Sequence, residues 1–141
     1  LYTHTMEETI FAKIIRREIP ADIVYEDEHT LAFLDVNPVN PGHTLVVPKK
    51  FARNILDVDK ELLAAVMNTV QKISIALRET LGAEGINIHI NNESAAGQLV
   101  FHYHVHVIPR YAGDGIVLQH GAPYPPGESA KVASKLRTKL G

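Results

Sequence analysis

The chain of 141 residues is long enough for one compact domain, because a single core of this size buries roughly two-thirds of the unfolded surface. Its formal net charge of −2 and isoelectric point near 6.5 leave no excess of lysine and arginine for binding phosphates, so we expect no nucleic acid partner. The absence of cysteine excludes a disulfide framework and a zinc site built on thiolates.

No segment predicts insertion into a membrane or export. The apolar runs, such as TLVVP and INIHI, are far shorter than the about 18 residues that a membrane span needs. The first ten residues lack a basic start followed by an apolar stretch. We therefore expect a soluble, cytoplasmic protein with no membrane partner. Residues 1–8 are expected to be an N-terminal extension, in which Met6 is a candidate natural start and Leu1 to Thr5 would then be foreign to the natural chain.

The amino-terminal third predicts a short helix and three strands. Apolar residues recur at helical spacing in IFAKIIRREI, residues 10–19, and Pro20 ends this pattern. Three strand-like runs follow: IVYE at 23–26, TLAFL at 30–34 and HTLVVP at 43–48. The segment DVNPVNPGH, residues 35–43, has the composition of an ordered loop, with Gly42 as the expected position of positive φ.

The longest predicted helix begins at about Lys60. Its apolar stripe consists of Leu63, Val66, Met67, Val70, Ile73, Leu77 and Leu81. Asp57 or Asp59 is available as the N-cap, and Gly82 as the terminator.

Two further strands and a final helix complete the prediction. Residues 86–91, INIHIN, alternate isoleucine with polar residues, which is typical of a half-buried strand. Residues 99–108, LVFHYHVHVI, predict the fifth strand. A stretch rich in glycine and proline, residues 113–127, leads to a tail helix in residues 129–140, packed on the body or on a partner.

These elements predict an α+β fold. It has a five-stranded, mainly antiparallel sheet, one long helix, one short helix and the C-terminal tail helix, because most strands are joined by short turns. Such a sheet has an exposed edge that a second copy of the chain can cover, so we expect a homodimer.

The stretch FHYHVHVIPR, residues 101–110, contains the candidate functional residues. His102, His104 and His106 occupy every second position, so on a strand they point to one face at a spacing of about 6.6 Å. Three interpretations are open: a hydrogen-bonded polar face, a metal site, or nucleophilic catalysis.

A metal site is the second interpretation. The tips of the first and third imidazoles would lie roughly 13 Å apart, whereas zinc–nitrogen bonds are about 2 Å. A third ligand such as His43 or His89 would have to substitute for one of them.

Nucleophilic catalysis fits the pattern best. A histidine attacks phosphorus through an unprotonated nitrogen, so its other ring nitrogen must keep a proton and be held by a carbonyl or an imidazole. The preceding turn SAAGQ has small residues that let backbone N–H groups approach an anion.

The motif HYHVHVI resembles the signature of the histidine triad (HIT) family of nucleotide-binding proteins. The likeness extends from about Thr9 to Arg110, and the segment from PRYAGDG onward is similar to a bacterial-type branch of this family. The resemblance implies a HIT-like catalytic domain in residues 9–110, followed by a C-terminal tail with a helix in residues 111–141.

The resemblance also implies a mechanism. His104 is the nucleophile that attacks the α-phosphorus of a purine nucleotide, and water then hydrolyses the nucleotidyl-histidine. His106 and His43 orient the nucleophile or contact phosphate, and the carbonyl or ring of His102 fixes its tautomer. The resemblance implies neither a metal ion nor a cofactor.

Nucleotide-binding residues follow from the same resemblance. Asp35 corresponds to the ribose-binding acid, which suits two sugar hydroxyls because a carboxylate accepts several hydrogen bonds. The other implied contacts are an apolar wall for the purine, Ile10, Phe11, Phe33 and Val36, and a phosphate-side lining, Asn91, Gly97, Gln98 and Leu99. His89 is expected to be only a polar-face residue.

Asn91 favours the phosphoramidate-hydrolysing branch, because the dinucleoside polyphosphate branch usually has glutamine there. Leu99 departs from that branch, which has a serine at this position, and YPPG at residues 124–127 lies farther from the triad than the Trp-Pro-Pro-Gly of the family. We predict a hydrolase or transferase of purine nucleoside 5′-phosphoramidates or related nucleotidyl bonds. The alternatives are a dinucleoside polyphosphate hydrolase, a purine-nucleotide binding module with negligible catalysis, and a zinc hydrolase.

Overall fold

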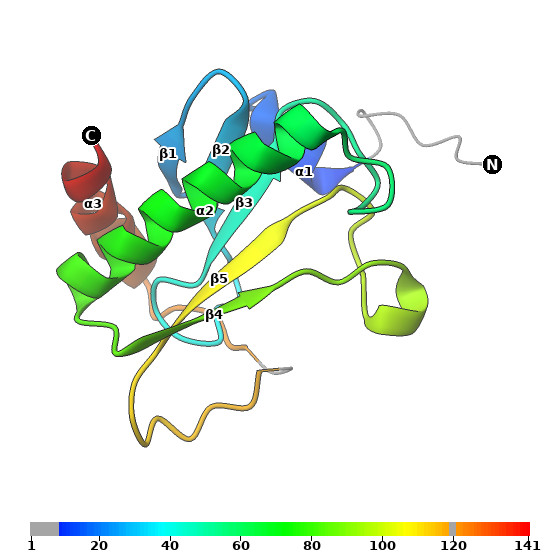
Figure 1. The fold of residues 1–141 in the computed structure, drawn as a ribbon. Coiled ribbons are helices and arrows are strands. Elements are labelled where there is room, and N and C mark those ends of the chain that lie inside the picture. Colours follow the sequence, from blue (N-terminus) through cyan, green and yellow to red (C-terminus); the bar gives the residue numbers. More distant parts are fainter. Residues whose placement is uncertain (1–8, 119–120) are drawn as a thin grey trace.

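The structure, a computed structural model, describes residues 9–118 and 121–141, so the expected extension of residues 1–8 with Met6 lies outside the described residues. Its five strands form one antiparallel sheet in the order β1-β2-β3-β5-β4 (Figure 1). The strands are β1 (Ile23–Glu26), β2 (Thr30–Leu34), β3 (Thr44–Pro48), β4 (Gly85–His89) and β5 (Val105–Arg110). The helices are α1 (Ile10–Ile15), α2 (Lys60–Leu81) and α3 (Glu128–Leu140), with a 3₁₀ turn, η2 (Ser94–Ala96). The predicted α+β architecture, including the tail helix, is confirmed.

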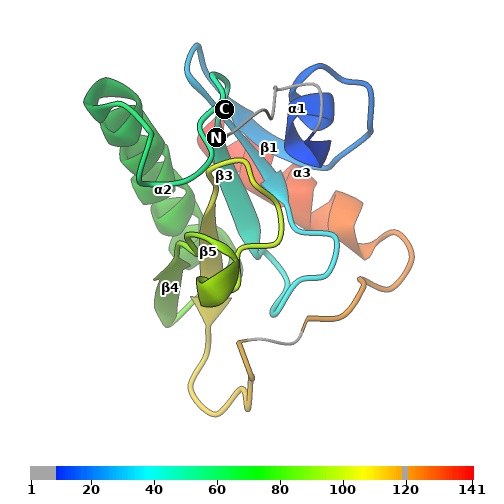
Figure 2. The ribbon, with the colours of Figure 1, turned by 90° about the vertical axis from the view of Figure 1, so that its right-hand side faces the viewer.

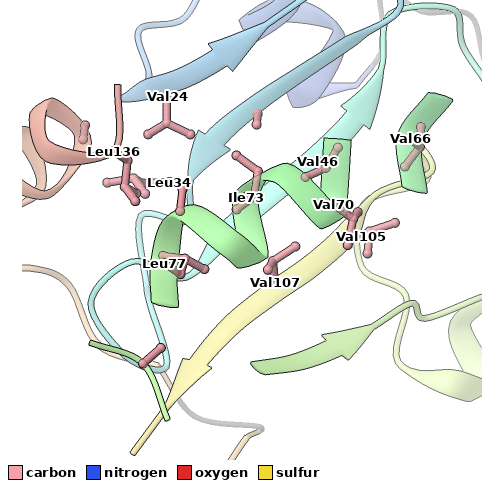
Figure 3. Packing of buried hydrophobic residues seen from close by; sticks show 14 of the residues in the cluster. Val24, Leu34, Val46, Val66, Val70, Ile73, Leu77, Val105, Val107 and Leu136 are labelled. Atoms are coloured by element: carbon pink, nitrogen blue, oxygen red, sulfur yellow. The ribbon is translucent and has the colours of Figure 1, made fainter. Parts of the chain in front are cut away.

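Helices cover both faces of the sheet (Figures 1 and 2). The larger core lies under α2 and α3, and its buried residues include Val46, Val105, Val107, Ile73, Leu77 and Leu136 (Figure 3). A smaller cluster lies under α1, and its buried residues are Phe11, Ile14, Leu31, Phe33, Leu45 and Val47. Because β2 and β3 contribute side chains to both clusters, they are buried along their whole length.

Local sequence signals define the ends of α2. Asp59 is the N-cap, and its carboxylate accepts a hydrogen bond from the Leu62 N–H at 2.8 Å. Asp57 instead accepts hydrogen bonds from the backbone N–H groups of Arg53 and Asn54. Gly82 has a φ of 68° and terminates the helix, as predicted.

The loop between β2 and β3 lies against the end of α2. Gly42 has a φ of 98°, as expected, and a Cβ there would lie 2.7 Å from Leu81 Cδ1 and 2.9 Å from Leu77 Cδ2. Only glycine provides both the conformation and the space. The loop that precedes His43 is thereby held in one place.

The fifth strand is shorter at its start than predicted. It begins at Val105 rather than at residue 99, because the ladder between β3 and β5 ends at the Val46–Val105 pair. The Tyr103 N–H donates to the Ala52 carbonyl instead, at 2.8 Å. Tyr103, Val105 and Val107 nevertheless pack together in the core under α2.

The first helix and the fourth strand also end earlier than predicted. Helix α1 stops at Ile15, and Arg17 adopts a φ of 65° that lets the N–H groups of Glu18 and Ile19 return to the Lys13 carbonyl. Strand β4 stops at His89 because its partner strand begins at Val105. Among the described residues, no helix has the length and hydropathy to cross a membrane.

Helix α3 is an integral part of the core. Leu136 is fully buried against α2 and the sheet, so Leu136→Ala is expected to lower the free energy of unfolding by about 3 kcal/mol. The exposed neighbour variant, Lys135→Ala, is expected to change it by at most about 0.5 kcal/mol. Urea denaturation of both variants measures this, and equal values would contradict the packing of the tail.

Candidate active site

A cavity of about 820 Å³ opens on the side of the sheet that α1 covers, and predicted site residues from four segments line it. They are Ile10, Phe11, Phe33, Asp35, Val36, His43, Asn91, Gly97, Leu99, His104 and His106. Gln98 and His102 do not line the cavity.

His104 has one ring nitrogen held and one free for chemistry. Its Nδ1–H donates to the backbone carbonyl of His102 at 2.7 Å, which leaves Nε2 unprotonated. The edge of the Phe11 ring packs against its imidazole, with ring centroids 4.9 Å apart. Burial lowers the pKa of His104, and the bond to the His102 carbonyl opposes this effect. His104 is therefore a neutral imidazole with an available lone pair.

His102 supports the nucleophile through its backbone. Its Nε2–H donates to the Pro48 carbonyl at 3.1 Å, so Nδ1 accepts the hydroxyl proton of Thr9 at 3.2 Å. The Thr9 oxygen in turn accepts the Ala12 N–H and caps α1. The resemblance implied that either the carbonyl or the ring of His102 fixes the tautomer of His104. In the structure the carbonyl holds His104, and the ring instead joins α1 to β3.

His43 and His106 form a second chain of hydrogen bonds. The Val39 N–H donates to His43 Nδ1 at 3.0 Å, so the ring proton of His43 is on Nε2. This proton faces His106 Nδ1 at 2.9 Å, which places the proton of His106 on its own Nε2. The rings of His104 and His106 lie 5.0 Å apart between centroids. Next to the nucleophile there is consequently a hydrogen-bond donor whose tautomer the backbone determines.

Burial also dominates the protonation of these two rings. It is the main cause that lowers the pKa of His106 to about 3, and the neighbouring His104 and His43 rings add to it. The pKa of His43 is lowered by burial, although the Asp35 carboxylate, 3.5 Å from its Nε2, acts in the opposite direction. The cavity thus contains neutral rings and one nearby carboxylate.

Asp35 stands at the end of β2 and lines the cavity. Its N–H donates to the His43 carbonyl, and its Oδ1 accepts the Asn37 N–H at 2.9 Å. This Asx turn directs the side chain beside His43.

Asp35, His43 and His106 place three potential metal ligands within 4.8 Å of one another. To bind an ion there, His43 would need a lone pair on Nε2, so its ring proton would have to be on Nδ1. His43 would then lose its hydrogen bonds with Val39 and His106. This trio contains only one histidine of the triad, and His102 is engaged elsewhere. The hydrogen bonds therefore favour the metal-free arrangement of these residues.

The expected apolar wall has an exposed and a buried part. Phe11 and Phe33 are buried with their ring centroids 5.5 Å apart in an edge-on contact, so they serve both core and cavity. Ile10 and Val36 also line the cavity, and they are 47% and 73% exposed.

The turn of residues 91–99 supplies the polar end of the cavity. Asn91, Gly97 and Leu99 line it, and Gly97 has a φ of 89°. Gln98 was expected to line it too, but its amide is buried and holds the turn from behind. Its oxygen accepts from the Glu93 N–H and from Asn54, and its nitrogen donates to the Arg53 and Val100 carbonyls. Gln98 is thus placed to position the turn.

Glu93 supports this turn, and the sequence did not reveal its role. Its backbone adopts φ 76° and ψ 160°, a region that costs a residue with a side chain about 1–3 kcal/mol. The carboxylate accepts two hydrogen bonds from Arg53, at 2.9 and 3.0 Å, and one from Asn54. Arg53 also lies over the Phe101 ring at 4.2 Å. No spacing rule connects residues 53 and 93, so only the folded chain shows this support.

His89 and the tail add to the cavity beyond the predicted set. His89 pairs with His106 across β4 and β5 and lines the cavity, consistent with its expected place on the polar face. Leu118 and Gly121 of the tail line it as well.

Comparisons with known proteins agree with this geometry. The family model described as HIT domain matches residues 16–113. The protein named Protein hit from Bacillus subtilis is 43% identical over 141 residues, covering 97% of both chains. The crystal structure of a Hit-like protein from Bartonella henselae has a TM-score of 0.89 and 44% identity, over 95% of this chain and 97% of its own. A zinc-bound histidine triad family protein from Mycobacterium smegmatis has a TM-score of 0.87 and 37% identity, over 96% and 95% of the two chains.

The chain belongs to the HIT family of nucleotide-binding proteins and hydrolases. The resemblance drawn from the HYHVHVI motif is thereby confirmed.

The neutral buried rings predict how stability depends on pH. His102 has a pKa of about 4 in the folded chain, against about 6.5 when unfolded, so between these values the unfolded chain binds more protons. The free energy of unfolding is therefore expected to fall as the pH drops from about 7 to about 5.

Urea midpoints at the two pH values test this expectation. The loss is expected to be smaller in His102→Gln, which removes one titrating ring, and unchanged in His29→Gln, which alters an exposed histidine. An equal loss in His102→Gln and the wild type would contradict the role of His102.

Proposed function

We propose that the chain is a hydrolase or transferase that cleaves purine nucleoside 5′-phosphoramidates or related nucleotidyl bonds through a covalent nucleotidyl-histidine. The observation that carries this proposal is the 2.7 Å bond from His104 Nδ1 to the His102 carbonyl. It leaves Nε2 of His104 as an unprotonated nucleophile in a cavity of a size suited to a nucleotide.

The cavity lining supports a nucleotide as substrate. The purine would lie against the apolar wall beside Phe11 and Phe33, and the ribose hydroxyls would donate to Asp35. The phosphate would meet backbone N–H groups near Gly97 and the Nε2–H of His106.

In the first step, Nε2 of His104 forms a bond to the α-phosphorus as the bond to the leaving amine breaks. Entry of the phosphate anion raises the pKa of His106, which takes up a proton and donates it to the leaving amine. In the second step water attacks phosphorus, returns a proton to His106 and releases the nucleoside monophosphate. His104 is then free again.

Leu99 limits the source of the leaving-group proton. It exposes 89% of its surface and lines the cavity, but it carries no hydroxyl. We therefore assign proton donation to His106, the ring that lies beside His104.

Replacing His104 tests the chemistry. After mixing with adenosine 5′-phosphoramidate and quenching, the wild type is expected to show a nucleotidyl adduct by intact-protein mass or to release AMP. His104→Ala is expected to show no adduct and to lose turnover by about a thousandfold or more, because the nucleophile is gone. His29→Ala, which alters an exposed histidine outside the cavity, is the control.

The same experiment separates the alternatives. Wild-type turnover in His104→Ala would refute the proposal. Bound nucleotide without turnover in either protein would favour the binding module. Faster AMP release from a diadenosine polyphosphate than from the phosphoramidate would favour the polyphosphate hydrolase.

We also propose a homodimer that forms through the β4 edge. Among the described strands, β4 pairs only with β5, so its other edge is open. Ile88 of β4 is paired with Val107 of the core under α2, so it points to the same side of the sheet. Ile88 is 39% exposed, and Met67 of α2 is 41% exposed. Location in the cytoplasm stays a prediction, with which the lack of cysteine agrees.

Size-exclusion chromatography with light-scattering detection measures the oligomeric state. Ile88→Lys places a charge on the proposed interface and is expected to give monomers at concentrations where the wild type is dimeric. Ser134→Lys, an exposed position on α3, is expected to stay dimeric. A wild type that is monomeric throughout, or a dimeric Ile88→Lys, would contradict the proposal.

A further inference from the structure

Two segments of the tail hold the loop of residues 35–43, which carries Asp35 and His43. On one side, Asp114 accepts a hydrogen bond from Asn40 Nδ2 at 3.1 Å. On the other, the chain between Gly121 and Tyr124 lies beside the loop (Figure 2). The tail is therefore in contact with the catalytic loop as well as with the core.

Tyr124 contacts the peptide that precedes His43. Its hydroxyl oxygen accepts the N–H of the buried Gly42 at 2.8 Å. The carbonyl of Gly42 accepts the Thr44 hydroxyl at 2.7 Å, so the residue before His43 is held at both its polar groups. His43 then orients His106 through the 2.9 Å bond between their rings. One phenol in the tail is thus connected to the proton donor of the site through two residues.

The tail packs closely against Asn37 because residue 121 is a glycine. A Cβ at position 121 would lie 1.9 Å from the Asn37 carbonyl oxygen, a distance that no side chain can adopt. The next N–H, that of Ala122, donates to the Pro38 carbonyl at 3.2 Å. Gly121 and Asn37 both line the cavity. Glycine at 121 therefore lets the tail form part of the cavity wall.

We propose that the tail segment of residues 121–124 completes the active site. Tyr124 is a positioning residue that holds His43 in place through Gly42, so that His43 Nδ1 stays opposite the Val39 N–H that sets its tautomer. Gly121 forms the wall of the cavity beside Asn37. The proposal rests on the proposed function for its kinetic readout, but its binding and spectroscopic readouts are independent of turnover.

A pair of tyrosine variants tests the positioning role. Tyr124→Phe leaves the buried Gly42 N–H without its partner, and we expect kcat for the phosphoramidate to fall about tenfold, with KM changed by less than about twofold. The matched control is Tyr111→Phe, which removes a hydroxyl that donates to the Leu81 carbonyl at 3.1 Å rather than bonding to a backbone group of the loop. Its kcat is expected to equal that of the wild type.

Nitrogen-15 spectra of the histidine rings provide a readout without turnover. In the wild type, Nδ1 of His43 is expected to be unprotonated and Nε2 protonated. In Tyr124→Phe the other tautomer is expected to become populated, whereas Tyr111→Phe keeps the wild-type spectrum. Equal kcat values for the two variants, or an unchanged His43 spectrum in Tyr124→Phe, would overturn the positioning role.

Glycine variants test whether Gly121 forms part of the cavity wall. Gly121→Ala must displace the tail from Asn37, so calorimetry is expected to show AMP binding weakened about tenfold. The control, Gly85→Ala, places its Cβ 3.9 Å from Arg110 Cβ in ordinary contact and is expected to bind AMP as the wild type does. Unchanged AMP binding by Gly121→Ala would contradict the proposal that Gly121 forms part of the cavity wall. If the wild type bound AMP but hydrolysed no phosphoramidate, the proposed function would fail while the spectra and AMP binding still decided this proposal.

Discussion

The site depends on keeping an imidazole neutral and in one tautomer inside a poorly solvated cavity. Burial alone makes His104 neutral, but it does not choose which nitrogen carries the proton. The carbonyl of His102 makes that choice, and the backbone N–H of Val39 makes the equivalent choice for His43 and, through it, for His106. Backbone groups are suited to this task because they cannot change their protonation state. Much of the surrounding structure can be understood as the means of keeping these two backbone groups in place.

One short segment serves both faces of the sheet. Residues 102 to 107 alternate between imidazoles on the α1 side and apolar side chains in the core under α2. Movement of the triad along its strand would therefore expose Val105 and Val107, each fully buried, and the core resists it. Packing under α2 thus contributes to the alignment of a site on the opposite face.

Local signals in the sequence were sufficient for the features that depend on neighbouring residues. A cap at Asp57 or Asp59, the terminator Gly82 and the positive φ of Gly42 were predicted because each follows from one or a few adjacent residues, and the structure has Asp59 as the cap. The late start of β5 was not predicted, because it depends on residues that are distant in sequence: the ladder with β3 ends at Val46, and the Tyr103 N–H donates to Ala52 instead. For the same reason Gln98 was assigned to the cavity, although its partners Arg53 and Asn54 hold its amide behind the turn. The side of the sheet that each triad histidine faces was predictable, but their hydrogen-bond partners were not.

The site is assembled from parts that are far apart along the chain. The Thr9–His102 contact joins residues 93 apart, the His43–His106 contact 63 apart, and the Gly42–Tyr124 contact 82 apart. Contacts at such separations form late, since the chain must lose loop entropy before they stabilise it. During synthesis, the β2–β3 loop leaves the ribosome long before Tyr124 is available to hold it. A nascent or partly folded chain would therefore have the triad but no ordered cavity, so that reactivity toward nucleotides develops only when folding is complete.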